Sequence, residues 1–183
     1  MDVDTEGQEA PLTGALTTRS ERRLASGHWL LAAAPSVSAA NAAWKETGET
    51  WLQPSPLFTA VLVPASIVHA ATGVDSPEEC APALQEALDG PVFYDPGAFR
   101  ADGAYVVLLP ASAATIWNVP STTLHAPRAL LLVPAPDRCE PVGDRPWWVL
   151  PLEGPGELCP PALLASLACL GRRRFVPSGG ELE

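Results

Sequence analysis

The segment from Leu57 to Gly73, LFTAVLVPASIVHAATG, decides the fold, because it has the pattern of a buried strand that runs directly into a helix. Its first half is a short apolar run rich in β-formers and bounded by prolines, which is typical of a strand buried on both faces. In its second half, Pro64 suits the first helical turn and Gly73 suits the left-handed residue after the last turn. We therefore expect a central strand over Leu57–Val63 with helices on each side, so that Leu62 is buried.

The remaining apolar segments predict a series of short strands and short helices. Helices are expected over residues 20–31, 36–44, 112–117 and 160–170, and strands from residue 51 and over 91–94, 104–109, 128–133 and 147–150. The strands over 91–94 and 104–109 flank the turn-rich Asp95-Pro96-Gly97, which favours an antiparallel hairpin. The sum is an α+β domain with a mostly antiparallel sheet covered by helices.

Two helix boundaries depend on glycine and proline. Ser76 with Glu79 has the pattern of a capping box, but Pro82 follows closely. Either the helix begins near Ala81, with Pro82 in its first turn, or it is kinked there, and in both cases we expect it to end at Gly90. Gly171 is expected to close the last helix.

The chain has the length of one domain, with ends that are not part of the core. Residues 1–20 have acidic residues but no apolar period and predict a disordered leader, residues 21–171 form the single domain, and residues 172–183 form a flexible tail. No apolar run is long enough to span a bilayer, and the acidic start does not resemble a secretion signal, so we expect no membrane partner and a cytoplasmic location.

The net charge of −10 bears on the partners of this domain. Between Ser26 and Gly171 there are fourteen Asp or Glu residues and only five Lys or Arg. Because nucleic-acid affinity comes largely from basic residues that displace counterions, nucleic acid is not an expected partner. The basic cluster Arg172-Arg173-Arg174 is better interpreted as an interaction with the dipole of the last helix.

Neither metal nor nucleophilic chemistry has a strong signal. The four cysteines show no C-x-x-C pair, so we predict no metal site and no cofactor. There is no G-x-S-x-G motif, and His69 lies among apolar residues where a structural role is favoured. His125, in a loop after three hydroxyl residues, is the one histidine that we name as a weak catalytic candidate.

Five short apolar segments between Trp44 and Ala168 follow one another in the order found in a known protein family. They are Leu57–Ala65 (LFTAVLVPA), Gly90–Phe93 (GPVF), Val107–Ala113 (VLLPASA), Leu131–Pro136 (LLVPAP) and Trp148–Pro151 (WVLP). In these pieces the chain resembles small actinobacterial proteins of the bifunctional DNA primase/polymerase-like group, which are relatives of the archaeo-eukaryotic primase superfamily. The resemblance implies a primase/polymerase-like fold.

The resemblance also implies that the catalytic acids are missing. In active members, the strand corresponding to Phe58–Pro64 holds two metal-binding aspartates, whereas the matching positions here are Thr59 and Leu62. A third acid has no counterpart, because residues 120–133 contain no Asp or Glu, and the histidine of the middle motif is absent from Val92–Leu109. Since two-metal phosphoryl transfer needs such carboxylates, the chain is not expected to polymerise.

Two hypotheses about function follow. The first is a non-catalytic domain that binds another protein or a second copy of itself, with Trp117, Trp147 and Trp148 as candidate binding residues. On a strand, Trp147 and Trp148 point to opposite faces, so we expect one in the core and the other at the surface, although packing beneath a helix is the alternative. The second hypothesis is a nucleotide-binding or metal-dependent nucleotidyltransferase site near Thr59, Leu62 and His125.

Overall fold

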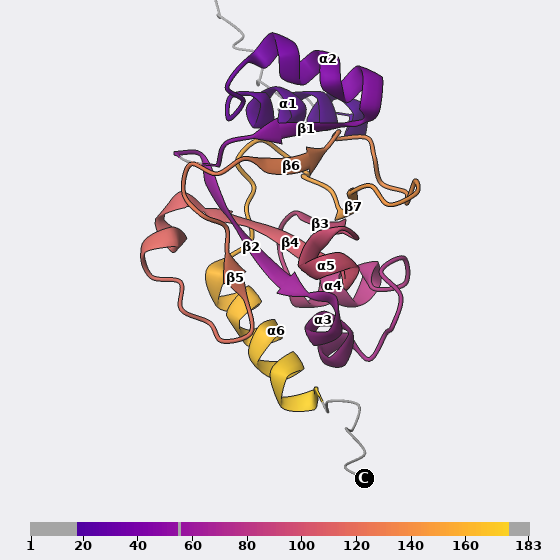
Figure 1. Cartoon of the computed structure of the whole chain (residues 1–183), viewed down its shortest axis with the longest axis vertical. Coiled ribbons are helices and arrows are strands. Elements are labelled where there is room, and N and C mark those ends of the chain that lie inside the picture. The colour runs from indigo at the N-terminus through magenta and orange to yellow at the C-terminus, as the bar shows by residue number, and fades with distance from the viewer. Residues whose placement is uncertain (1–17, 55, 176–183) are drawn as a thin grey trace, which may run out of the picture.

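A computed structural model describes residues 18–54 and 56–175 (Figure 1). Its helices are α1 (Arg19–Leu31), α2 (Val37–Thr47), α3 (Ala65–Thr72), α4 (Ala81–Ala87), the short turn α5 (Ala98–Ala101) and α6 (Pro161–Arg174), with a 3₁₀ turn at Ala111–Thr115. Its strands are β1 (Glu49–Leu52), β2 (Phe58–Pro64), β3 (Val92–Asp95), β4 (Ala104–Pro110), β5 (Thr123–Leu124), β6 (Leu131–Pro134) and β7 (Trp147–Leu150). Most of the expected leader and part of the expected tail lie outside the described residues.

The strands form one five-stranded sheet in the order β5-β2-β4-β3-β7 and a separate two-stranded ribbon of β1 and β6. Every strand pair is antiparallel, which confirms the predicted α+β class. The central strand is β4, not β2 as the sequence suggested. Strand β2 pairs with β4 along its whole length, but only the two-residue strand β5 covers its other edge.

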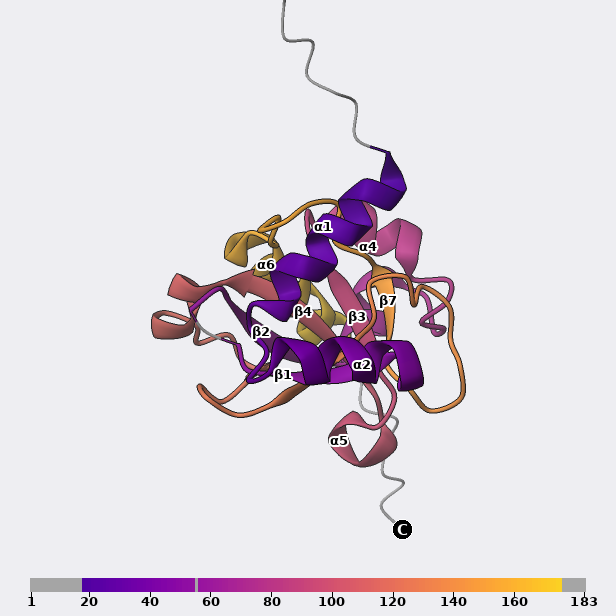
Figure 2. The same cartoon turned by 90° about the horizontal axis from the view of Figure 1, so that it is seen from above.

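Each face of the sheet packs against its own apolar core. Helices α3, α4 and α6 lie on one face, and the ribbon with α1 and α2 lies on the other (Figure 1). Seen from above in Figure 2, α1 and α2 cross over the strands. Side chains of β4 serve both cores, because Tyr105 and Leu109 point toward α3 and α6 while Val106 and Leu108 point toward the ribbon.

The ends of the first helices follow from local sequence. Thr18 and Glu21 form a capping box at the start of α1, which therefore begins inside the expected leader. Ser36 caps α2, and Gly48 and Gly73 adopt the left-handed conformation after α2 and α3. Strand β2 runs through Pro64, and α3 begins one residue later than expected.

The helix after Ser76 is shorter than the sequence suggested. The Ser76 hydroxyl donates to the Glu78 carboxylate at 2.6 Å and caps no helix. Helix α4 begins at Ala81 with Pro82 in its first turn, which was one of the two alternatives, and it ends at Ala87 instead of Gly90. Gly90 allows two backbone segments to lie very close together, since an added Cβ there would lie 2.4 Å from the backbone nitrogen of Cys159.

Gly171 does not close the last helix, contrary to expectation, because α6 continues to Arg174. A Cβ at Gly171 would lie 2.1 Å from the backbone oxygen of Ile67 in α3. The glycine therefore allows α3 and α6 to pack backbone to backbone. The predicted flexible tail is also corrected at its start, since Arg174 donates from Nη1 to the oxygen of Ala71 at 2.7 Å.

Candidate functional site

The two positions expected to mark a degenerate metal site lie on different faces of the sheet. Thr59 is opposite Leu109 in β4, and its side chain faces the core beneath α3 and α6. Leu62 is opposite Val106 and packs against the core beneath the ribbon. Residues three apart on a strand cannot point to one cleft. Leu62 is also only half-buried, whereas we expected it to be fully buried.

His125 follows β5 beside the same strand. Its backbone N–H donates to the oxygen of Ala60 at 2.9 Å, which fixes the loop against β2. Burial lowers the pKa of the half-buried imidazole, and backbone hydrogen bonding at Leu130 and Ala126 opposes this shift. Nδ1 is buried and has no hydrogen-bond partner among the described residues. His125 is thus placed beside β2, where its backbone bond reaches Ala60 and not Thr59 or Leu62.

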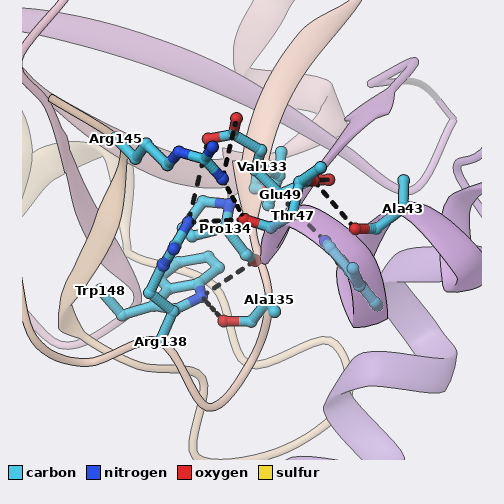
Figure 3. Close-up of polar contacts among 10 residues, drawn as sticks. Ala43, Thr47, Glu49, Val133, Pro134, Ala135, Arg138, Arg145 and Trp148 are labelled. Carbon is cyan, nitrogen blue, oxygen red and sulfur yellow. Dashed lines mark hydrogen bonds and ion pairs between the residues drawn. The ribbon is translucent and has the colours of Figure 1, made fainter. Parts of the chain in front are cut away.

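The tryptophan pair of β7 is buried on both sides, so the prediction that one of them faces outward is wrong. Trp147 and Trp148 do point to opposite faces, but their exposed fractions are 6% and 1%. Trp148 donates from Nε1 to the oxygen of Ala135 at 3.1 Å (Figure 3) and packs edge-on against Phe93. The cause is the second layer: the ribbon covers the face that a single-sheet domain would leave open.

Trp117 is half-buried at the edge of the core on the α3 side. Its Nε1 donates to the hydroxyl of Thr122 at 3.0 Å, and that hydroxyl donates to the oxygen of Val119 at 2.7 Å. The Trp117 indole is therefore held by hydrogen bonds within its own loop, between residues 117 and 122. None of the three tryptophans named from the sequence offers an exposed ring for a partner.

A polar cluster at the end of α2 connects that helix to the loop before β7 (Figure 3). The backbone oxygen of Thr47 accepts from Nη1 of Arg138 at 3.2 Å and from Nη1 of Arg145 at 2.5 Å. Glu49 lies 3.9 Å and 4.0 Å from the same two nitrogens. Both guanidinium groups thus contact the end of α2 and the start of β1, so this cluster holds the ribbon and α2 in place.

A cavity of about 660 Å³ near the start of α3 is lined by Ser66, His69 and Asp75 among other residues. These are residue types of a catalytic triad, but His69 Nε2 lies 3.1 Å from the hydroxyl of Tyr105 and makes no hydrogen bond to Ser66. Burial lowers the pKa of His69, an effect that Asp75 partly offsets, and burial strongly raises the pKa of Tyr105. His69 and Tyr105 are therefore both uncharged at neutral pH, and they share a hydrogen bond at the edge of the core.

The cysteines are all free, and Cys80 and Cys159 are buried. Burial raises the pKa of Cys159 to about 12, so its thiol is protonated at neutral pH. Within residues 18–54 and 56–175, no group of three or more His, Cys, Asp or Glu side chains is placed to hold a metal ion.

An open groove between α1, α2 and the loop after β6 is the surface best suited to a partner. It has a volume of about 390 Å³. Its α1 wall is the stripe Ser20, Leu24, Gly27 and Leu31, and its floor includes Trp44. Leu24 is 62% exposed. We refer to this site as the α1–α2 groove.

The charges at the groove differ from those of the rest of the surface. Arg19 and Arg23 line it, with Asp137 on the loop side, and no ion pair of the described residues includes either arginine. Nη2 of Arg23 lies 3.9 Å from the sulfur of Cys139, and its Nε is buried without a hydrogen-bond partner in the described residues. Sequence reasoning missed these residues, because the spacing of Leu24 and Leu31 shows a shared helix face but not whether that face is covered.

No helix in the described part of the chain has both the length and the apolar character needed to cross a membrane. Comparisons with protein-family models, with curated proteins and with solved structures found no match for this chain.

Proposed function

We propose that this chain is a non-catalytic, primase/polymerase-like domain that acts as an adaptor and binds another protein through the α1–α2 groove. The observation that carries the proposal is the exposure of Leu24, at 62%, above an apolar wall and floor. An exposed leucine beside a preformed apolar groove is the kind of feature that anchors protein partners.

The floor of the groove is rigid, which favours binding. Trp44 is buried, and its Nε1 donates to the oxygen of Val133 at 3.2 Å, so the indole cannot rotate into the groove. The Thr47, Arg138 and Arg145 cluster holds the next turn of the chain. A surface that is already ordered loses less conformational entropy when a partner binds.

The rival function, a nucleotide-binding or metal-dependent nucleotidyltransferase domain, has weaker support. The sheet separates Thr59 from Leu62, and no acidic group of the described residues contributes to the pKa shift of His125. Titration calorimetry with magnesium and a nucleoside triphosphate addresses this rival directly. We expect no saturable heat, whereas micromolar binding that His125→Ala abolishes would favour the rival.

A crosslinking experiment tests the adaptor proposal. A photoreactive phenylalanine analogue replaces Leu24 in the full chain, which is expressed in the cells that naturally produce it. The matched control carries the analogue at Ile116, which is 77% exposed and lies outside the groove. We expect one discrete protein adduct from position 24 that is absent from position 116. No adduct at position 24, or the same adducts at both positions, contradicts the proposal.

A further inference from the structure

We infer that the α1–α2 groove recognises an acidic, apolar peptide segment of its partner. This inference rests on the proposed function and names the chemistry of the partner. Arg19 and Arg23 supply two positive charges against the single carboxylate of Asp137 in the groove lining, and neither arginine forms an ion pair among the described residues. A carboxylate bound beside them gives Arg23 the charged hydrogen bond that its contact with a neutral sulfur does not provide.

Arg22, next to Arg23 in the sequence, differs from the two arginines of the groove. Arg22 is one residue away but lies outside the groove lining, and its Nη2 pairs with Glu153 at 3.6 Å. The net charge of the chain is −10, which by itself repels an acidic partner. At physiological ionic strength, however, charges farther than about 8 Å are largely screened, so that a bound partner responds mainly to Arg19, Arg23 and Asp137 in the groove.

The apolar part of the groove determines the apolar character and the length of the segment that it can bind. Gly27 is buried where the loop after β6 packs on α1, since an added Cβ there would lie 3.0 Å from Cγ of Pro136. The exposed apolar contact that the groove offers a partner is therefore Leu24. From Arg19 to Leu31 the wall runs the length of α1, about 20 Å at the rise of an α-helix, which matches a segment of roughly thirteen helical residues.

Selection from a random peptide library tests this preference, because it requires no assumption about the sequence of the partner. The full chain is the target, and peptides of about sixteen residues are long enough to span the wall. Selected peptides are then counter-screened against Arg23→Gln and Leu24→Ser, with Arg22→Gln as the matched control. The dissociation constant of a synthetic copy is measured by fluorescence anisotropy at low and high salt.

We expect selected peptides to combine Asp or Glu with Leu, Ile or Phe. Arg23→Gln should weaken their binding about tenfold, since a hydrogen bond to a charged group is lost, while Arg22→Gln should leave it within about twofold. Affinity should fall as salt rises.

Other outcomes overturn the inference in distinguishable ways. Neutral or basic peptides that need Leu24 but not Arg23 would leave the adaptor proposal intact and remove the acidic preference. Selected peptides that bind Leu24→Ser as well as the parent chain would exclude the groove and with it both proposals. A dimer of the parent chain that Leu24→Ser abolishes in analytical ultracentrifugation would identify a second copy as the occupant instead.

Discussion

Thr59 and Leu62 project from opposite faces of strand β2, and the more enclosed of the two is the threonine. Thr59 is 6% exposed and faces the core beneath α3 and α6, whereas Leu62 is half-buried beside the two-residue strand β5. The sequence predicted that Leu62 is buried, whereas the structure shows Thr59 as the more buried of the two residues.

Substitution by aspartate at these two positions tests the arrangement. Thr59→Asp places an unpaired carboxylate in an apolar site and should lower the free energy of unfolding by about 3 kcal/mol or more. Leu62→Asp should cost less, because its carboxylate can reach water at the sheet edge. Urea denaturation of both variants measures the difference. If Leu62→Asp proves the more damaging, Leu62 is enclosed and the open edge beside β5 does not exist in solution.

Gly171→Ala tests the contact between α3 and α6. In a helix interior, alanine normally stabilises relative to glycine by about 0.5–1 kcal/mol. Here the added methyl would lie 2.1 Å from the oxygen of Ile67, so the helices must separate. We expect a loss of about 2 kcal/mol instead of a gain, as in other overpacked cores. Ser166→Ala, in the same helix but away from this contact, is the control. A melting temperature at or above that of the parent would mean that α3 and α6 are less closely packed.

The pH dependence of stability should report His69. Burial lowers the pKa of this imidazole in the folded chain below its usual value of about 6.5. The unfolded chain therefore binds a proton first as pH falls, so stability is retained above about pH 6.5 and declines as pH drops toward the lowered pKa of the folded state. His125 acts in the same direction. Unfolding free energies at several pH values should decline less steeply in His69→Gln than in the parent. An equal slope in both would show that His69 contributes nothing to this dependence.

The parts of the fold that could be predicted from the sequence are those that depend on local signals. Ser36, Gly48 and Gly73 end or start helices because cap chemistry acts within one turn. The β3–β4 hairpin was predicted from two strand segments that flank the turn residues Asp95-Pro96-Gly97, for the same reason. Strand β5 was not predicted, since a two-residue strand has no period to detect and exists only because β2 offers an unpaired edge.

The candidate site was harder to predict, because it depends on which faces are covered. Alternation correctly separated Trp147 from Trp148, but it could not show that a ribbon distant in sequence covers the second face. In the same way, residues seven apart in a helix, such as Leu24 and Leu31, share one face of α1, but this spacing does not show that Leu24 is exposed and Leu31 buried. Burial by distant segments is a tertiary property that a local pattern does not contain.

Leu24 and Leu30 separate binding from stability on the same helix. Leu24 is 62% exposed above the groove, whereas Leu30 is fully enclosed in the core beneath the ribbon. Leu24→Ser removes little buried surface, so the free energy of unfolding should change by less than about 0.5 kcal/mol. Leu30→Ser removes a buried side chain of the same size and adds a buried hydroxyl, so it should cost about 3–5 kcal/mol. Chemical denaturation of both variants, followed by tryptophan fluorescence, makes the comparison. If Leu24→Ser is destabilised as strongly as Leu30→Ser, then another segment of the chain covers Leu24 in solution, and the α1–α2 groove is not open to a partner.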